Sequence, residues 1–161
     1  MLIRTGSIAE FYGLIPKVPE LNQNHTFRHY KTRLEGKIWL ILIAERNNEV
    51  CGFKVGYGID DKIFYSWVGG VMPNYRRAGV AQALLDAQES WAWVNNFHTI
   101  KVKTSLGFPA MISFLESNEY KLHESWEEAQ LYSKHRPNNG FNRTPVSFAA
   151  AKPVRFDGGA G

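Results

Sequence analysis

The chain has 161 residues, a hydrophobic fraction of 44% and a formal net charge of +4. This length fits one domain with a substantial core, and no apolar run reaches the roughly 18 residues that would span a bilayer, so we expect no membrane partner. The modest positive charge is compatible with an anionic ligand. Because the chain lacks a dense Lys/Arg stripe with interleaved aromatics, we expect no nucleic-acid partner.

Cysteine and histidine usage bounds the chemistry. The single cysteine, Cys51, excludes an internal disulfide framework and lies in an apolar stretch, where a buried thiol is expected. The first residues show no charged leader before a long apolar segment, so we expect no signal peptide and a cytoplasmic protein. We expect no metal, because no joint ligand spacing connects the five histidines, which are His25, His29, His98, His123 and His135.

The first half of the chain predicts a short strand, two helices and then three strands. Ser7 has capping-box spacing to Glu10 at the start of the first helix, and Pro16 stops that helix. The pairs at 47–48 and 60–61 are turn signals, so the three strands are expected to form an antiparallel meander. The expected strands are residues 2–4, 37–45, 49–58 and 62–72, and the expected helices are residues 7–15 and 25–36.

The second half predicts a strand–helix–strand unit. Over residues 79–96 apolar side chains recur at three- and four-residue steps, which indicates an amphipathic helix with Trp91 toward the core. Pro109 suits the first turn of a second helix. The remaining expected elements are a strand at 98–104, that helix at 108–118 and a hairpin at 120–125 and 129–135. A meander followed by such a unit predicts the α+β class with a mixed sheet.

Residues 1–135 are expected to form this single domain. From residue 136 to 161 prolines, asparagines and glycines accumulate without periodicity. We expect an extended or flexible C-terminal tail there, with the alternative that the segment wraps the domain or a partner subunit.

The stretch "VMPNYRRAGVAQALL", residues 71–85, breaks two local rules. Arg76 and Arg77 precede a helix whose N-terminus already carries partial positive charge, and Gly79 falls in the expected first turn, where glycine costs stability. First-turn N–H groups lack internal acceptors and can bind phosphate. A phosphate group would explain both exceptions; the alternative is that the arginines are solvated and the glycine is tolerated.

Residues 71–85 closely resemble the signature of the GNAT superfamily of N-acetyltransferases, V-x-P-x-[YW]-R-x-x-G-[IV]-[GA]-x-x-L. Its core, Q/R-x-x-G-x-G/A, is matched by Arg76, Gly79 and Ala81. The element order agrees through about residue 134, so the resemblance covers most of the chain but not the tail. It implies a mixed, mostly antiparallel central sheet flanked by helices, with a bulged strand before the cofactor-binding loop and helix.

The resemblance implies acetyl-CoA as cosubstrate, no metal, and direct acetyl transfer to a primary amine. Val71 and Met72 are the expected contacts for the pantetheine arm, which would lie where their strand diverges from the next parallel strand near residues 102–104. The Val71 amide is also expected to polarise the thioester carbonyl. The pyrophosphate would bind main-chain amides of Arg76, Arg77, Ala78, Gly79, Val80 and Ala81.

Gly69 and Gly70 lie inside the strand that leads to this loop. Glycines at such positions indicate either a β-bulge or a close approach of another part of the chain. Because the family's strand bends at a bulge, the resemblance favours a bulge at these two glycines.

The catalytic acid departs from the family pattern. Leu115 stands where many members carry a tyrosine that protonates the thiolate, and Glu119 and Tyr120 replace a "GF" pair. The asparagine that many members carry near the start of the preceding helix is also not evident. The general acid is therefore unassigned, with Ser105, near the expected thiol, or water as the alternatives.

The general base is equally open. Tyr65 and Trp67 alternate along their strand and share a face, which is either the acceptor pocket or the core. Glu45 is either a candidate base or a solvated strand end. The missing tyrosine keeps a second function open, a non-catalytic acyl-CoA-binding module. The acceptor remains unidentified, a small molecule or a protein amine, and a homodimer stays open because similar proteins often dimerise.

Overall fold

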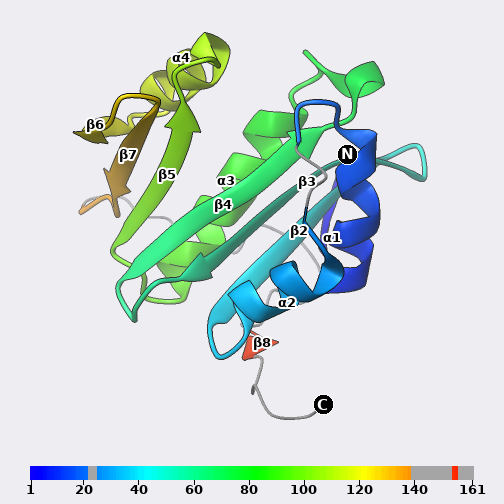
Figure 1. Ribbon diagram of the computed structural model, residues 1–161, viewed down its shortest axis with the longest axis horizontal. Helices are drawn as coiled ribbons and strands as arrows, with labels where there is room; N and C mark the ends of the chain where they lie inside the picture. Colours follow the sequence, from blue (N-terminus) through cyan, green and yellow to red (C-terminus); the bar gives the residue numbers. More distant parts are fainter. Residues whose placement is uncertain (22–24, 139–153, 156–161) are drawn as a thin grey trace.

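The computed structural model describes residues 1–21, 25–138 and 154–155. Its central sheet has the strand order β1-β2-β3-β4-β5-β7-β6, with β8 pairing with β2 (Figure 1). The strands are β1 Leu2–Thr5, β2 Ile38–Arg46, β3 Glu49–Gly58, β4 Ile63–Val71, β5 Thr99–Ser105, β6 Lys121–Ser125, β7 Ala129–His135 and β8 Val154–Arg155. The α-helices are α1 Ile8–Leu14, α2 Phe27–Leu34, α3 Val80–Val94 and α4 Pro109–Ser117, and the 3₁₀ turns are η1 Ile15–Lys17 and η2 Pro73–Tyr75.

All neighbouring strands pair antiparallel except β4 and β5, which are parallel. The connection between these two strands contains α3, as a parallel pair requires a crossover. The predicted α+β class with a mixed, mostly antiparallel sheet is confirmed.

Local signals place most element ends as expected. The Ser7 hydroxyl accepts a hydrogen bond from the Glu10 amide at 3.0 Å, which caps α1. The Thr26 hydroxyl caps α2 in the same way, so this helix begins at Phe27 and not at residue 25 as expected. The turn between β2 and β3 has left-handed backbone at Asn47 and Asn48, the conformation of a tight hairpin.

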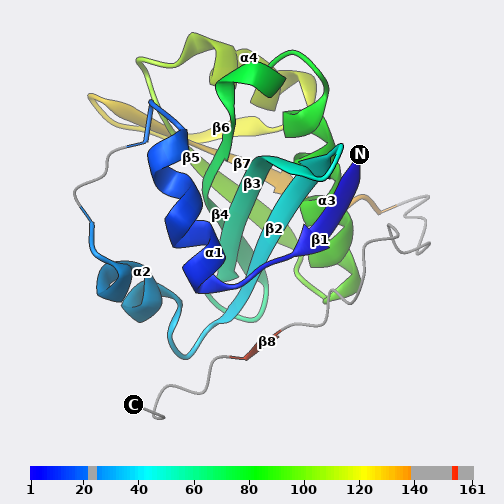
Figure 2. The same ribbon diagram turned by 90° about the vertical axis from the view of Figure 1, so that its right-hand side faces the viewer.

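Helices cover both faces of the sheet (Figure 2), and a hydrophobic core lies on each face. The core under α1 and α2 includes the fully buried side chains of Phe11, Leu34, Ile43, Phe53 and Val55. The core under α3 and α4 includes Leu42, Phe64, Leu85, Ile100 and Leu115. Trp91 is buried in this second core, as its position in the predicted helix requires. Of the helices in the described residues, none combines the length and apolar character that a membrane crossing demands.

Two residues of the expected tail belong to the sheet. In β8, Val154 pairs with Trp39 and Arg155 with Ile38, at the edge of β2 that β1 occupies further along. This pairing is the kind of contact that a domain-wrapping segment would make. The rest of the expected tail, residues 139–153 and 156–161, lies outside the described residues.

A substitution at Phe11 tests how α1 packs on the sheet. Its fully buried ring contacts the rings of Tyr30, Phe53 and Trp67 at 5.2–6.3 Å between centroids. We expect Phe11→Ala to lower the free energy of unfolding by about 3–5 kcal/mol, because it removes buried area and leaves a cavity. Urea denaturation measures this loss. Phe27→Ala is the matched control: Phe27 is 39% exposed, so a comparable loss there would contradict the assignment of Phe11 to the core.

Candidate active site

Strands β4 and β5 pair over only part of their length. The parallel register runs from Ile63 opposite Thr99 to Ser66 opposite Val102. Beyond that point no further register pairs join the two strands within the described residues, and their carboxyl ends diverge (Figure 1). Divergence was expected at residues 102–104, and the structure places it there. The facing edges of both strands are thereby left without a strand partner.

The divergence coincides with a β-bulge at Trp67. In the β3–β4 ladder Val55 pairs with Val68 and Gly56 pairs with Ser66, so Trp67 is the extra residue on β4. An extra residue increases the local twist and bends its strand. The bulge therefore turns β4 away from β5 immediately after their last shared pair.

The predicted bulge at Gly69 and Gly70 is wrong in position, and the alternative of a close approach applies to both residues. A Cβ at Gly70 would lie 2.8 Å from Cγ2 of Val18, and one at Gly69 would lie 3.1 Å from the carbonyl oxygen of Phe53. The glycines are thus required by packing against η1 and β3. This packing keeps the bent end of β4 close to the α1 side of the sheet.

Val71 has its amide on the diverging edge. The Met72 amide donates to the Cys51 carbonyl of β3 at 2.9 Å. Because N–H groups alternate between the two edges of a strand, the Val71 amide faces away from β3, toward the side of β5. The Val71 carbonyl faces the same way and accepts from Nε of Arg76 at 3.3 Å. Met72 is itself buried in the α1/α2 core, so Val71 is the more accessible of the two predicted contact residues.

The loop before α3 ends in a left-handed glycine. Gly79 has φ of 79° and is the N-cap residue, so it precedes the helix, whereas the sequence predicted it in the first turn. Left-handed backbone explains why glycine stands here. The first helical bond runs from the Ala83 amide to the Gly79 carbonyl, which leaves the amides of residues 80–82 without helical acceptors.

The space at this helix start is open. A Cβ built on Gly79 would meet no atom within 4 Å among the described residues, and no side chain in that part of the chain caps the helix. Arg77, also left-handed with φ of 61°, is exposed beside it. Unbonded amides, the positive end of the helix dipole and a neighbouring guanidinium together favour an anion here.

The Arg76 side chain contacts other groups of the protein, whereas the sequence suggested that it would face a phosphate. Its guanidinium forms an ion pair with Glu20 at 2.6 Å, in addition to its bond to the Val71 carbonyl. The same arginine holds the pKa of Glu20 below its usual value. The Tyr75 hydroxyl donates a hydrogen bond to the carboxylate of Glu49 at the start of β3. The two side chains therefore connect the loop to the segment after η1 and to β3.

The family model for the acetyltransferase (GNAT) family matches residues 8–120. The chain belongs to the GNAT family. No curated protein matches its sequence. The matched range contains the divergent strands, the loop and α3, so the family assignment rests on the segment that forms the site.

Solved GNAT structures share this fold. The ribosomal-protein-S18-alanine N-acetyltransferase of Escherichia coli is similar with a TM-score of 0.71 and 15% identity, over 85% of this chain and 96% of that one. Ard1 of Thermoplasma volcanium gives 0.69 and 17%, over 83% and 95%. A GNAT acetyltransferase of Elizabethkingia anophelis with acetyl-CoA bound gives 0.68 and 14%, over 83% and 97%. At these identities the similarity establishes the fold.

The described residues place no side-chain acid at the position where the GNAT pattern has a tyrosine. Leu115 is buried in the α3/α4 core and carries no proton to donate. The hydroxyl of Ser105 accepts from the Gly107 amide at 3.3 Å. This bond closes a local turn at the end of β5, of which Ser105 is the last residue.

Two buried tyrosines, Tyr120 and Tyr132, lie on this face, and sequence reasoning assigned a chemical role to neither. The Tyr120 hydroxyl donates to Glu89 of α3 at 2.8 Å, and Lys134 of β7 contacts the same carboxylate at 3.0 Å. The Tyr132 hydroxyl donates to Gln130 at 3.1 Å. Burial, with a nearby carboxylate, raises the pKa of both phenols, so they are protonated at neutral pH. The partner of Tyr120, Glu89, lies 31 residues away in the sequence, so no local motif indicates this contact.

The candidates for the general base, Tyr65, Trp67 and Glu45, lie on two different strands of the sheet. Tyr65 and Trp67 share the α1/α2 face as predicted, partly buried against that core. Glu45 accepts from Arg4 at 2.9 Å on β2, two strands away from β4, so the structure does not bring it to the diverging strands. The rings of His25 and His29 stack at 4.0 Å, and the described residues contain no group of three metal-binding side chains.

Lys54 is the lysine with the clearest electrostatic perturbation. It pairs with Leu42 of the α3/α4 core, so the two side chains share a face, and it lies opposite Gly69. Burial lowers the pKa of Lys54 to about 8, against a smaller opposing effect of the Glu89 charge. The folded protein therefore holds a lysine that loses its proton more readily than an exposed one.

This shift predicts a pH-dependent stability. Between pH 8 and the ordinary lysine value near 10.4, the unfolded chain binds more protons than the folded chain at this site, so stability rises with pH. We expect Lys54→Met to remove that rise and to increase the free energy of unfolding at pH 7 by roughly 1–3 kcal/mol, since no charge is then buried. Urea denaturation at pH 7 and 10 measures both, with exposed Lys121→Met as control. Lys54 is half-buried, and equal pH dependence in wild type and Lys54→Met would contradict its lowered pKa.

Proposed function

We propose that this protein transfers the acetyl group of acetyl-CoA directly to a primary amine. The observation that carries the proposal is the open first turn of α3 beside an unpaired edge of β4. A pyrophosphate suits the open first turn of the helix, where amides lack acceptors. An extended arm that contains amides suits the unpaired edge of β4, because it can hydrogen-bond that edge as an added strand would. Both features belong to the segment matched by the family model.

The proposed fit assigns individual residues to the parts of acetyl-CoA. We assign the pyrophosphate to the amides of residues 76–81, with Arg77 as the nearby cation. The freest of these amides are Val80 and Ala81, together with that of Gln82, which the sequence did not indicate. The Val71 amide is assigned to the thioester carbonyl, where a fixed donor stabilises the oxyanion that forms during transfer. Acetyl-CoA supplies an activated acyl group, and the described residues offer no metal site.

The reaction balances without a covalent enzyme intermediate. The neutral amine nitrogen attacks the carbonyl carbon, the C–N bond forms, and the C–S bond breaks as the tetrahedral intermediate collapses. The amine loses one proton to water, and the thiolate of coenzyme A gains one from water, since Leu115 provides none. Holding both reactants in place supplies much of the rate.

Leu115 also supports a second candidate function, a non-catalytic acyl-CoA-binding module. A buried leucine at the usual acid position would be tolerated where no thiolate is formed. Release of free thiol from acetyl-CoA, measured against a panel of peptide N-termini, amino acids and polyamines, separates the two functions. Transfer requires thiol release with at least one amine. Tight binding of acetyl-CoA with no release on any amine would favour the module.

Gly79 gives a charge test of the phosphate assignment. Aspartate and asparagine both tolerate left-handed backbone, and the open space at Gly79 accommodates either. We expect Gly79→Asp to bind acetyl-CoA about tenfold or more weakly than Gly79→Asn, because a carboxylate beside the pyrophosphate repels it. Isothermal titration calorimetry measures both affinities. Equal affinities in this matched pair would contradict the assignment of the pyrophosphate to this loop.

A further inference from the structure

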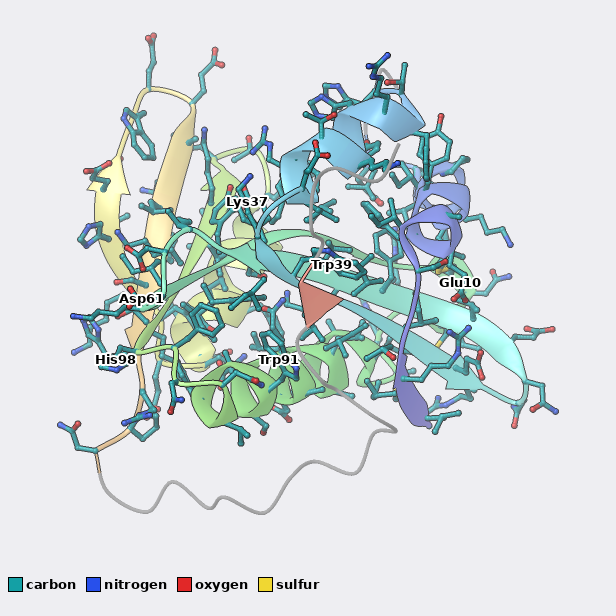
Figure 3. The ribbon with its side chains drawn as sticks, turned by 90° about the horizontal axis from the view of Figure 1, so that it is seen from below. Glu10, Lys37, Trp39, Asp61, Trp91 and His98 are labelled. Atoms are coloured by element: carbon teal, nitrogen blue, oxygen red, sulfur yellow. The ribbon has the colours of Figure 1, made fainter. Side chains whose placement is uncertain are left out.

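An open hollow of about 550 Å³ lies against α2, on the face of the sheet opposite α3. It is lined by Thr26, Arg28, His29, Thr32, Arg33 and Lys37. Three of these side chains are cationic, two are hydroxyls, and no carboxylate is among them. We call this hollow the α2 pocket. Lys37 lies on the α2 side of the sheet, and Trp91 lies on the α3 side (Figure 3).

Two of the three cations of the α2 pocket, Arg33 and Lys37, are held by neutral groups. Nη1 of Arg33 donates to the Tyr57 hydroxyl at 3.0 Å, and its guanidinium carbon lies 5.2 Å from the centre of the Trp67 ring. Nζ of Lys37 lies 5.2 Å from the centre of the Tyr57 ring and donates to the Arg33 carbonyl at 2.6 Å. Such contacts orient a cation without neutralising its charge. The charges of Arg33 and Lys37 are therefore oriented by these contacts and remain available to an anion.

The α2 pocket is connected to the reaction centre through Trp67. This residue is the bulge at which β4 leaves β5, and its ring contacts Arg33. Val71, the assigned thioester contact, lies four residues further along β4. At about 3.3 Å per residue the two positions are on the order of 13 Å apart. An acceptor that enters on the α1/α2 face would thus extend from Val71 toward Arg33.

We propose that the α2 pocket binds an anionic group, a carboxylate or a phosphate, that the acceptor carries on the order of 13 Å or more from its accepting amine, because Trp67, on which Arg33 lies, is already about that far from Val71. This inference rests on the proposed acetyl transfer and names the class of acceptor. A polycationic amine would meet three like charges on the same path. Cations in the last turn of α2 also complement its dipole, but Arg28 lies in the first turn, where the dipole opposes it, so the dipole alone does not explain the cluster.

A set of amidated hexapeptides with free N-termini tests the inference. An extended chain spans about 3.3–3.6 Å per residue, so a side chain at the fourth position matches the distance. The peptides carry glutamate, phosphoserine or glutamine at the fourth position, or glutamate at the second, in an otherwise alanine sequence. The steady-state rate of thiol release gives kcat and KM for each peptide. Glutamate and phosphoserine at the fourth position distinguish a carboxylate from a phosphate.

We expect the anionic fourth-position peptides to exceed the glutamine peptide in kcat/KM by about tenfold or more, as charge-assisted hydrogen bonds predict. Arg28→Gln should raise KM for the anionic peptides toward that of the glutamine peptide and leave the glutamine peptide unchanged. Lys121→Gln, an exposed cation on the edge strand β6, is the matched control and should change neither. Addition of about 0.5 M salt should reduce the preference for anionic peptides, because salt screens the attraction between the pocket and the anion.

Three outcomes would overturn the inference. The first is equal turnover of the glutamate and glutamine peptides by the wild type. The second is a preference for anionic peptides that persists in both Arg28→Gln and Arg33→Gln. The third is transfer to polyamines or other small amines but to no anionic peptide. Each leaves acetyl transfer itself intact. Absence of thiol release with every amine would instead contradict the proposed function, and the inference with it.

Discussion

The register break between β4 and β5 is the constraint on which the site depends. A strand inside a sheet normally pairs on both edges, because an unsatisfied backbone amide is costly when water is excluded. Here β4 keeps its partner β3 as far as Val71 and loses β5 after Ser66. The bulge at Trp67 makes the separation a property of the fold, since one extra residue on β4 shifts all later residues relative to β3 and bends the strand. An edge that is unpaired inside a sheet can accept the amides of an extended ligand.

Several tertiary contacts hold this break in place. Gly70 allows Val18 to pack directly on the bent end of β4, and the ion pair between Arg76 and Glu20 joins the following loop to the same segment of the chain. An exposed ion pair contributes little to stability, about 0–1 kcal/mol. Its effect here is positional, because it directs the Arg76 guanidinium to the Val71 carbonyl and leaves Arg77 exposed at the helix start. The two adjacent arginines therefore have different tasks.

The proposed site has a donor side and an acceptor side that meet at β4. Helices α3 and α2 lie on opposite faces of the sheet (Figure 2). The proposed pyrophosphate position is at the N-terminus of α3, and the α2 pocket is lined by residues of α2 and its two ends. Both proposed binding regions are positive, which agrees with the net charge of +4. In the proposed arrangement, acceptor and acetyl-CoA approach from opposite faces and meet near Val71, beyond the last pair of β4 and β5.

Local sequence signals predicted the elements well because each depends on near neighbours. The cap at Ser7, the turn at Asn47 and Asn48, and the loop motif around Gly79 are all decided within a few residues. The bulge could not be located in this way, because it depends on the pairing of β4 with β3, and the glycines that suggested it are explained by Val18 and Phe53. Local signals also cannot show that Arg33 contacts Trp67, or that Tyr120 contacts Glu89.

The measurement closest to the central claim is a titration of the ¹⁵N-labelled protein with coenzyme A, followed by backbone amide chemical shifts. We predict saturable shifts at the amides of Val71, Val80 and Ala81, because one ligand occupies both the helix start and the open edge of β4. Shifts confined to the α2 pocket, or saturation that leaves the Val71 and Val80 amides unmoved, would contradict the account.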